Sequence, residues 1–335
     1  MTATEEQAGS TGGFGSVGLF RKIAAGLVVA VGVVFIVVTF VNNLFAVGPA
    51  FEELIDDFRP VLTDESLAQA RSDIAGLEAA GQEFQDAVAP GMAQALGVTP
   101  EEFGAMVQSN YPAVAQGMAA LPEITPTFSG LVDTLESQQD LFASADAIPT
   151  DDLPATTVPW IITIGGILAI VLGVLLFLPG RLWGILTAVL GVALLAGTFA
   201  LSLPQKAADA DELNDNLKPI YTQELIDNAN GALAVVAAMG EEMQTKMLPD
   251  LAQQLGMSAE ELGGFLAQNF PATAAAIQTM GESLERFQGF VGTFETNLEN
   301  YETIQPVAFS PIIWMMVIGG IIILIAGGYC IAFKA

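Results

Sequence analysis

Four stretches of this chain are apolar over more than 20 residues, and they constrain its fold more than any other feature. They cover residues 23–47, 158–178, 182–203 and 311–333, and none contains an Asp, Glu, Lys or Arg. A helix of about 20 residues crosses a hydrocarbon core of roughly 30 Å. We therefore predict an all-α integral membrane protein with four transmembrane helices.

Basic residues near the ends of these stretches predict their orientation. Arg21 and Lys22 precede the first stretch, Arg181 lies between the second and third, and Lys334 follows the fourth. Because cytoplasmic loops carry an excess of Lys and Arg, we place all four in the cytoplasm. The predicted order is a cytoplasmic tail (1–22), a first span (23–47), a first extracellular domain (48–157), a second span (158–178), a cytoplasmic turn (179–181), a third span (182–203), a second extracellular domain (204–310), a fourth span (311–333) and a cytoplasmic end (334–335).

The first stretch has a second interpretation as a cleaved signal peptide. Ala46-Val47-Gly48 offers the small residues of a cleavage site. The apolar stretch is about ten residues longer than the core of a usual signal peptide. This length favours a permanent span.

The same unit occurs twice in the chain. Residues 92–123 align without gaps with residues 251–282, and 12 of the 32 pairs are identical. A slightly shorter offset pairs Trp160 with Trp314 in the second and fourth spans. We therefore predict an internal duplication, with two homologous extracytoplasmic helical-bundle domains in tandem. Because both copies enter and leave on one side, a pseudo-two-fold axis along the membrane normal should relate them.

Glycines recur at intervals of seven residues inside the predicted spans. Small residues let membrane helices approach closely, so we assign these glycines to helix packing rather than to an ion pathway. The pseudo-symmetry also favours a homodimer of the whole chain. The glycines assigned to packing are Gly166, Gly173, Gly184, Gly191, Gly320 and Gly327.

The acidic residues lie in the two outer segments and in the N-terminal tail. Residues 48–157 hold 19 acids and two bases, and residues 204–310 hold 16 acids and four bases. Acids minus bases gives net charges of -17 and -12, within a total of -27 for the chain. An anionic surface repels nucleic acid, which we exclude as a partner.

Both outer segments carry a helix-start signal at the same point of the repeat. Thr99-Pro100-Glu101-Glu102 is a capping box with Pro at the first helical position. Ser258-Ala259-Glu260-Glu261 keeps the cap and the reciprocal Glu. We predict a helix beginning at each signal, within domains of about four helices.

The chain has no His and one Cys, which excludes several classes of chemistry. His-based acid–base catalysis, Ser-His-Asp and Cys-His nucleophiles and the common zinc sites all need residues that are missing. The outer segments also lack Cys and glycosylation sequons, which an animal surface protein usually contains. We expect a multi-pass protein of a prokaryotic plasma membrane, with no catalytic residue, cofactor or metal ligand.

Two groups of residues are candidates for metal binding. Met239, Met243 and Met247 recur every four residues, as in a thioether site for a soft metal. Their counterparts in the first copy keep only the apolar character, which favours a buried core. Acidic pairs such as Glu52-Glu53 and Asp151-Asp152 attract divalent cations, but they lack the spacing of a calcium loop, which favours a solvated face.

An aromatic residue precedes a proline at the same point of both copies. The triplets Asn110-Tyr111-Pro112 and Asn269-Phe270-Pro271 are candidates for an interaction site at a helix junction. A structural corner is the favoured interpretation, because Pro restricts the residue before it. Cys330 is a candidate for acylation, with a small buried hydrophobe as the default.

The order of span, large helical outer domain, span and short inner turn, made twice, resembles the topology of the prominin and tweety tetraspan membrane proteins. The resemblance covers nearly the whole chain and rests on topology rather than on a motif. It implies a membrane-organising or vesicle-shaping role with lipid or sterol contact.

These features favour a non-catalytic membrane scaffold or accessory protein, whose acidic helical outer domains bind a protein partner or a second copy of the chain. Membrane lipids are the other expected partner. The alternative is a lipid-handling or transport-related role at the interface of the two repeats. An apolar substrate fits that alternative, because the spans contain no charge. An outward-facing hydrolase would need Asp and Glu pairs working without His, and amphipathic helices offer no evident cleft for it.

Overall fold

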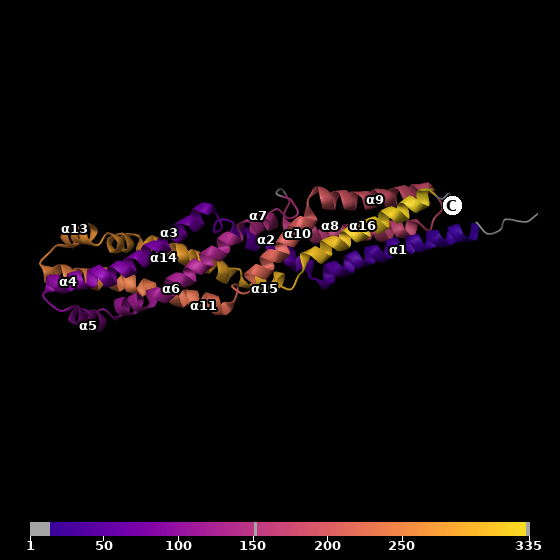
Figure 1. The fold of residues 1–335 in the computed structure, drawn as a ribbon. Helices are drawn as coiled ribbons and strands as arrows, with labels where there is room; N and C mark the ends of the chain where they lie inside the picture. The colour runs from indigo at the N-terminus through magenta and orange to yellow at the C-terminus, as the bar shows by residue number, and fades with distance from the viewer. Residues whose placement is uncertain (1–13, 151–152, 333–335) are drawn as a thin grey trace, which may run out of the picture. The chain divides into compact units, whose positions relative to one another are not determined.

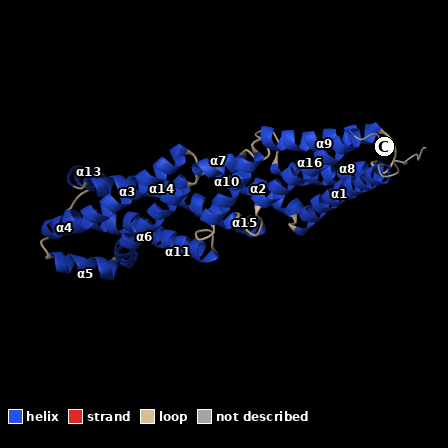
Figure 2. Ribbon diagram, turned by 45° about the vertical axis from the view of Figure 1, so that its right-hand side comes forward, coloured by secondary structure: helices blue, strands red, loops and turns tan. Residues whose placement is uncertain are grey.

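The computed structural model describes residues 14–150 and 153–332, which are almost entirely helical (Figures 1 and 2). No strand occurs within these ranges, so the predicted all-α class is confirmed. Four helices are long and apolar enough to cross a membrane, as predicted. Most of the predicted cytoplasmic tail, the pair Asp151-Asp152 and Lys334 lie outside the described residues.

The chain divides into two compact units, which we describe separately. The apolar unit comprises Met1–Glu53, Leu141–Asp215 and Asn300–Ala335. The acidic unit comprises Leu54–Asp140 and Asn216–Glu299. Each unit therefore contains residues from both halves of the sequence.

The apolar unit is built on α1 (Phe14–Val41), α8 (Val158–Leu175), α9 (Arg181–Ala200) and α16 (Phe309–Ala332). Helix α1 packs along α8, and α9 packs along α16. Further contacts join α1 to α16 and α8 to α9 (Figure 1). Large apolar side chains on all four helices remain exposed, which suits surfaces that face lipid.

The ends of two apolar helices differ from the predicted boundaries. Helix α1 extends before Ile23 through Arg21 and Lys22, and it ends at Val41 instead of 47. Asn43 then adopts a left-handed conformation with φ of 50°, and Ser202 does the same after α9 with φ of 53°. Few non-glycine residues adopt this conformation, although Asn does so more readily than most. The backbone therefore breaks at both points, and α2 (Leu44–Phe58) and α10 (Leu203–Leu217) begin there.

The acidic unit is built on four long helices that pack in a ring. They are α3 (Asp64–Glu83), α6 (Pro112–Ser137), α11 (Gln223–Glu242) and α14 (Pro271–Thr296). Helix α3 contacts α6, α6 contacts α11, α11 contacts α14, and α14 contacts α3. We expected two separate bundles in tandem, but these helices form one bundle, to which each half of the chain contributes two long helices.

The rest of both units consists mainly of shorter helices. The π-helices η1 (Phe84–Val88) and η3 (Met243–Met247) follow α3 and α11. Most of these elements begin and end at matching positions of the repeat in the two halves of the chain. The remaining helices are α4 (Ala89–Leu96), α5 (Pro100–Asn110), α7 (Gln139–Asp146), η2 (Ala155–Thr157), α12 (Leu248–Leu255), α13 (Ala259–Asn269) and α15 (Leu298–Ile304).

The two predicted helix starts are confirmed. The Thr99 side chain accepts from the backbone N–H of Glu102, and the Glu102 carboxylate accepts from the N–H of Thr99. Ser258 and Glu261 form the same reciprocal pair at the start of α13. Each capping box satisfies two donors that a helix N-terminus otherwise leaves unpaired.

Candidate functional site

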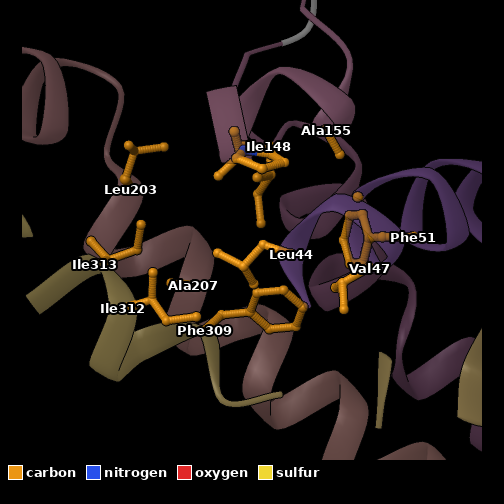
Figure 3. A pocket seen from close by; sticks show the side chains of 13 residues that line it. Leu44, Val47, Phe51, Ile148, Ala155, Leu203, Ala207, Phe309, Ile312 and Ile313 are labelled. Atoms are coloured by element: carbon orange, nitrogen blue, oxygen red, sulfur yellow. The ribbon is translucent and has the colours of Figure 1, made fainter. Parts of the chain in front are cut away.

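The candidate functional site is an apolar pocket in the apolar unit, with a cavity volume of about 60 Å³. Its walls come from the N-terminal halves of α2 and α10, the first turns of α8 and α16, η2 and the segment around Ile148 (Figure 3). The lining residues are Leu44, Val47, Gly48, Phe51, Ile148, Ala155, Val158, Pro159, Leu203, Ala207, Phe309, Ile312 and Ile313.

Local backbone features place these walls. The breaks at Asn43 and Ser202 start new helices, so Leu44 and Leu203 lie at the beginnings of α2 and α10. A Cβ on Gly48 would lie 3.3 Å from the Thr156 Cα, so α2 passes close to η2 at this point. The missing side chain of glycine permits this approach.

Most residues that line the pocket come from matching positions in the two halves of the sequence. Leu44 and Leu203 occupy matching positions of the repeat, as do Gly48 and Ala207. Three further pairs match at the shorter offset that relates Trp160 to Trp314. These pairs are Ala155 with Phe309, Val158 with Ile312, and Pro159 with Ile313. Ten of the thirteen lining residues therefore come as matched pairs, one from each half of the chain.

Every side chain that lines the pocket is apolar. A buried water needs two to four polar partners, and apolar cavities stay dry. The Phe51 and Phe309 rings meet with centroids 5.7 Å apart and planes at 61°. The pocket is therefore suited to an apolar group.

Charged groups lie next to the pocket residues along the chain. The Lys206 Nζ donates to the backbone oxygens of Ala147 and Pro149, at 2.5 and 3.4 Å. The Asp211 carboxylate accepts from the backbone N–H groups of Phe309 and Ser310, at 2.6 and 2.9 Å. This carboxylate satisfies free donors at the start of α16.

Glu52 is the counterpart of Asp211 in the first half of the chain. Its Oε2 atom is buried, and no described group donates a hydrogen bond to it. Among the described hydrogen bonds, the two matched carboxylates differ, because Asp211 caps a helix and the Glu52 Oε2 atom has no donor.

The predicted junction triplets form corners of the acidic unit. Asn110, Pro112, Asn269 and Pro271 are exposed, whereas the aromatic residues between them are buried. The Tyr111 hydroxyl donates to the Asp250 carboxylate at 3.0 Å. At the matching corner, the Phe270 ring packs against Gly91. A Cβ on Gly91 would lie 2.9 Å from the Phe270 Cζ atom. Both corners thus connect one half of the chain to the other, and their burial suits a structural role.

The Tyr111 hydroxyl is held in its neutral form. Burial, the hydrogen bond to Asp250, and the negative charges of Asp250 and Glu242 raise the pKa of Tyr111 to about 12. Each of these effects disfavours the phenolate.

Two carboxylates whose role as helix caps was not predicted from the sequence link the halves of the acidic unit. The Glu83 carboxylate accepts from the Thr273 N–H at the start of α14. The Glu242 carboxylate accepts from the N–H groups of Ala113 and Val114 at the start of α6, at 2.7 and 3.1 Å. The signal available in the sequence was an identical Glu at matching positions of the two copies.

The six glycines assigned to packing all lie at close helix contacts. A Cβ on Gly166 would lie 2.8 Å from the Gly32 oxygen, and one on Gly191 would lie 2.6 Å from the Leu324 nitrogen. Gly173 lies against α1, Gly184 against α16, and Gly320 and Gly327 against α9.

The candidate metal residues are placed as follows. Met239, Met243 and Met247 are buried in the core of the acidic unit, as their apolar counterparts in the first copy predicted. Among the described residues, no three His, Cys, Asp or Glu side chains are grouped to hold a metal ion. Cys330 is buried in α16, in line with its assignment as a small hydrophobe.

Four of the five basic residues in the acidic unit form ion pairs within it. Their carboxylate partners lie on the same bundle or at its edge, so these pairs reduce the positive charge available to other molecules. The pairs are Arg59 with Asp56, Arg71 with Asp133 and Glu136, Lys246 with Glu242, and Arg286 with Asp73.

We compared the chain with known proteins, and no family model, curated protein or solved structure matches it.

Proposed function

We propose that the protein is a non-catalytic membrane scaffold, whose acidic unit binds a protein partner at the surface of a prokaryotic plasma membrane. The observation that carries the proposal is the charge of this unit. Residues 54–140 and 216–299 hold 25 acidic side chains and five basic ones. Because most of the bases are already paired, the remaining carboxylates favour a partner with a basic surface.

The architecture of the acidic unit agrees with a binding role. Its core is filled by apolar side chains such as Met92, Phe103 and Leu262. Reciprocal carboxylate caps join the two halves of the bundle. A rigid bundle presents a surface at low cost in conformational entropy on binding.

We further propose that the chain arose by internal duplication and has parallel topology. Matching element boundaries, paired carboxylates and paired pocket residues support this inference. Arg21, Lys22 and Arg181 lie at one end of the apolar helices, which supports a cytoplasmic location for that end. The acidic segments would then be extracytoplasmic. This topology agrees with the membrane-organising role implied by the resemblance to prominin and tweety proteins.

Crosslinking in native membranes tests the scaffold proposal. Photoreactive residues at exposed positions of the acidic unit, such as Glu78 and Glu282, should give one defined crosslinked protein partner. Salt should weaken the association, because exposed charges are screened over about 10 Å at 0.1 M ionic strength. A chain that gives no adduct, or an adduct that salt does not affect, would contradict the proposal.

A charge-neutralised variant provides a sharper test. Glu282→Gln and Glu285→Gln remove two exposed charges from α14 without changing side-chain shape. We expect weaker recovery of the partner. The matched control is Gln278→Glu, which adds charge to the same helix and should not reduce recovery. Crosslinking between two copies of the chain would instead show self-association.

A further inference from the structure

We propose that the apolar pocket holds an acyl chain of a glycerophospholipid, with the lipid phosphate at Lys206. This site goes beyond the scaffold role, because it lies in the apolar unit and needs no protein partner. Figure 3 shows the side chains of α2, α10 and α16 around the common space that the chain would enter.

The chemistry of the pocket selects an acyl chain. Its lining has no hydrogen-bonding side chain, so a polar ligand or a cluster of water would be left unpaired. Its volume of about 60 Å³ is well below the roughly 150 Å³ cavity that accommodates benzene. A short stretch of a flexible chain fits this space, whereas the fused rings of a sterol do not.

The position of the pocket suits a lipid whose head group lies at the membrane surface. The pocket is lined by the first turns of α8 and α16, directly beside two exposed aromatic residues. Trp160 follows Pro159, and Trp314 follows Ile313. These tryptophans are 59% and 51% exposed. Tryptophan is enriched where the hydrocarbon core meets the head groups.

Lys206 provides the group that would bind the phosphate. It precedes the lining residue Ala207, and its Nζ donates to the two carbonyl groups on either side of Ile148, another lining residue. A lysine ammonium has three donors, so the two carbonyl oxygens leave capacity for a third acceptor. Among the described carboxylates, none forms an ion pair with Lys206.

The two carboxylates closest to Lys206 along α10 are engaged elsewhere. Asp209 accepts hydrogen bonds from Ser144 and Gln205. Asp211 caps the start of α16. The other described bases of the apolar unit are Arg21, Lys22 and Arg181, near the opposite ends of its helices. Lys206 is therefore the described cation next to the pocket.

Native mass spectrometry of the full chain tests this proposal. Protein purified in a mild detergent, delipidated and then given palmitoyl-oleoyl-phosphatidylglycerol should retain one tightly held lipid per chain. Ala207→Phe places a ring in the pocket and should reduce retention at least tenfold. The matched control is Ala208→Phe, which places the same ring on an exposed position of the same helix and should retain the lipid.

Two further variants keep the test decisive. Ala207→Leu fills less of the pocket and should give an intermediate loss, so it replaces Ala207→Phe if that variant does not fold by circular dichroism. Lys206→Gln should weaken binding about fivefold, in line with the typical contribution of one basic residue near an anionic lipid surface.

Wild-type protein without a bound lipid, or a folded Ala207 variant with full retention, would overturn the acyl-chain site. Unchanged binding by Lys206→Gln would overturn the phosphate assignment. These measurements use the isolated chain, so their failure is distinct from failure of the scaffold proposal.

Discussion

The carboxylate of Glu83 accepts a hydrogen bond of 2.7 Å from the backbone N–H of Thr273, although the two residues are 190 positions apart. In the other direction, Glu242 caps the start of α6. Each carboxylate belongs to the last residue of a helix from one half of the chain. It accepts hydrogen bonds from backbone N–H groups at the start of a helix from the other half. The caps therefore join the two halves across the bundle.

Removing the first of these caps should destabilise the bundle locally. Glu83→Ala leaves the Thr273 N–H without its acceptor, which we expect to cost about 1 kcal/mol, as for other lost helix caps. Hydrogen exchange should become faster in the first turn of α14. Glu78→Ala changes an exposed glutamate on the same helix and serves as the control. Equal protection of α14 in both variants would contradict the assigned role of Glu83.

The second cap should make the acidic unit sensitive to acid. Burial acts to raise the pKa of the Glu242 carboxyl, but hydrogen bonds from Val114, Lys246 and Ala113 and the charge of Lys246 hold it below the ordinary value of 4.5. The stabilisation is therefore present above pH 4.5 and is lost as the pH falls through the lower pKa of the folded state.

Unfolding measured from about pH 6 to about pH 3 checks this expectation. The wild type should lose stability as the pH falls, and part of that dependence should be missing from Glu242→Gln, which carries no titrating carboxyl. Glu260→Gln, at an exposed glutamate, is the control and should follow the wild type. Identical pH profiles for all three proteins would exclude Glu242 as the source.

Local features of the fold were predictable from the sequence because their signals are local. The capping boxes at Thr99 and Ser258 lie within four residues of chain, and each apolar helix has a composition that only lipid or a core accommodates. The breaks at Asn43 and Ser202 were missed, because a single left-handed residue inside an apolar stretch leaves no periodic signal. The predicted spans therefore ran past both breaks.

Features that join distant residues were not predictable in the same way. The alignment of the two copies identified matching positions, but it does not show which of them meet. Glu83 pairs with Thr273 in the other copy, and Tyr111 pairs with Asp250. The pocket depends on four helix starts that come together only in the folded chain. Side-chain packing thus decided that the two outer segments form one bundle instead of two.

Tyr111 should show an unusually alkaline titration. Its pKa of about 12 compares with an ordinary value of 10.0, so the neutral phenol contributes stability that is present below pH 10 and lost as the pH rises through about 12. Because burial also raises the pKa of Tyr301, the absorbance titration is run in a Tyr301→Phe background. The late ionisation should be present in Tyr301→Phe and absent from the double variant that also carries Tyr111→Phe.

The matching corner indicates how well Tyr111→Phe will be tolerated. Phe270 occupies that corner without a hydroxyl, so the ring alone fits. We expect a cost of about 1 kcal/mol, because Asp250 loses a hydrogen-bond donor. Tyr329→Phe is the control and should leave the ionisation near pH 12 in place. A Tyr111→Phe protein that keeps this phase would show that another tyrosine causes it.

Two adjacent glycines of α16 should respond in opposite ways to the same substitution. A Cβ on Gly327 would lie 2.7 Å from the Gly184 oxygen and 2.8 Å from the Ala188 Cα, whereas one on Gly328 meets nothing within 4 Å. Gly327→Ala must therefore push α16 away from α9, and we expect a loss of about 1–3 kcal/mol. Gly328→Ala should be neutral or stabilising by up to about 1 kcal/mol, because Ala is the better residue inside a helix.

Cys330, the one cysteine of the chain, is buried beside this contact, so labelling by a thiol-reactive dye on heating reports unfolding in each variant. Equal melting temperatures for the two variants would show that α9 and α16 do not pack through Gly327.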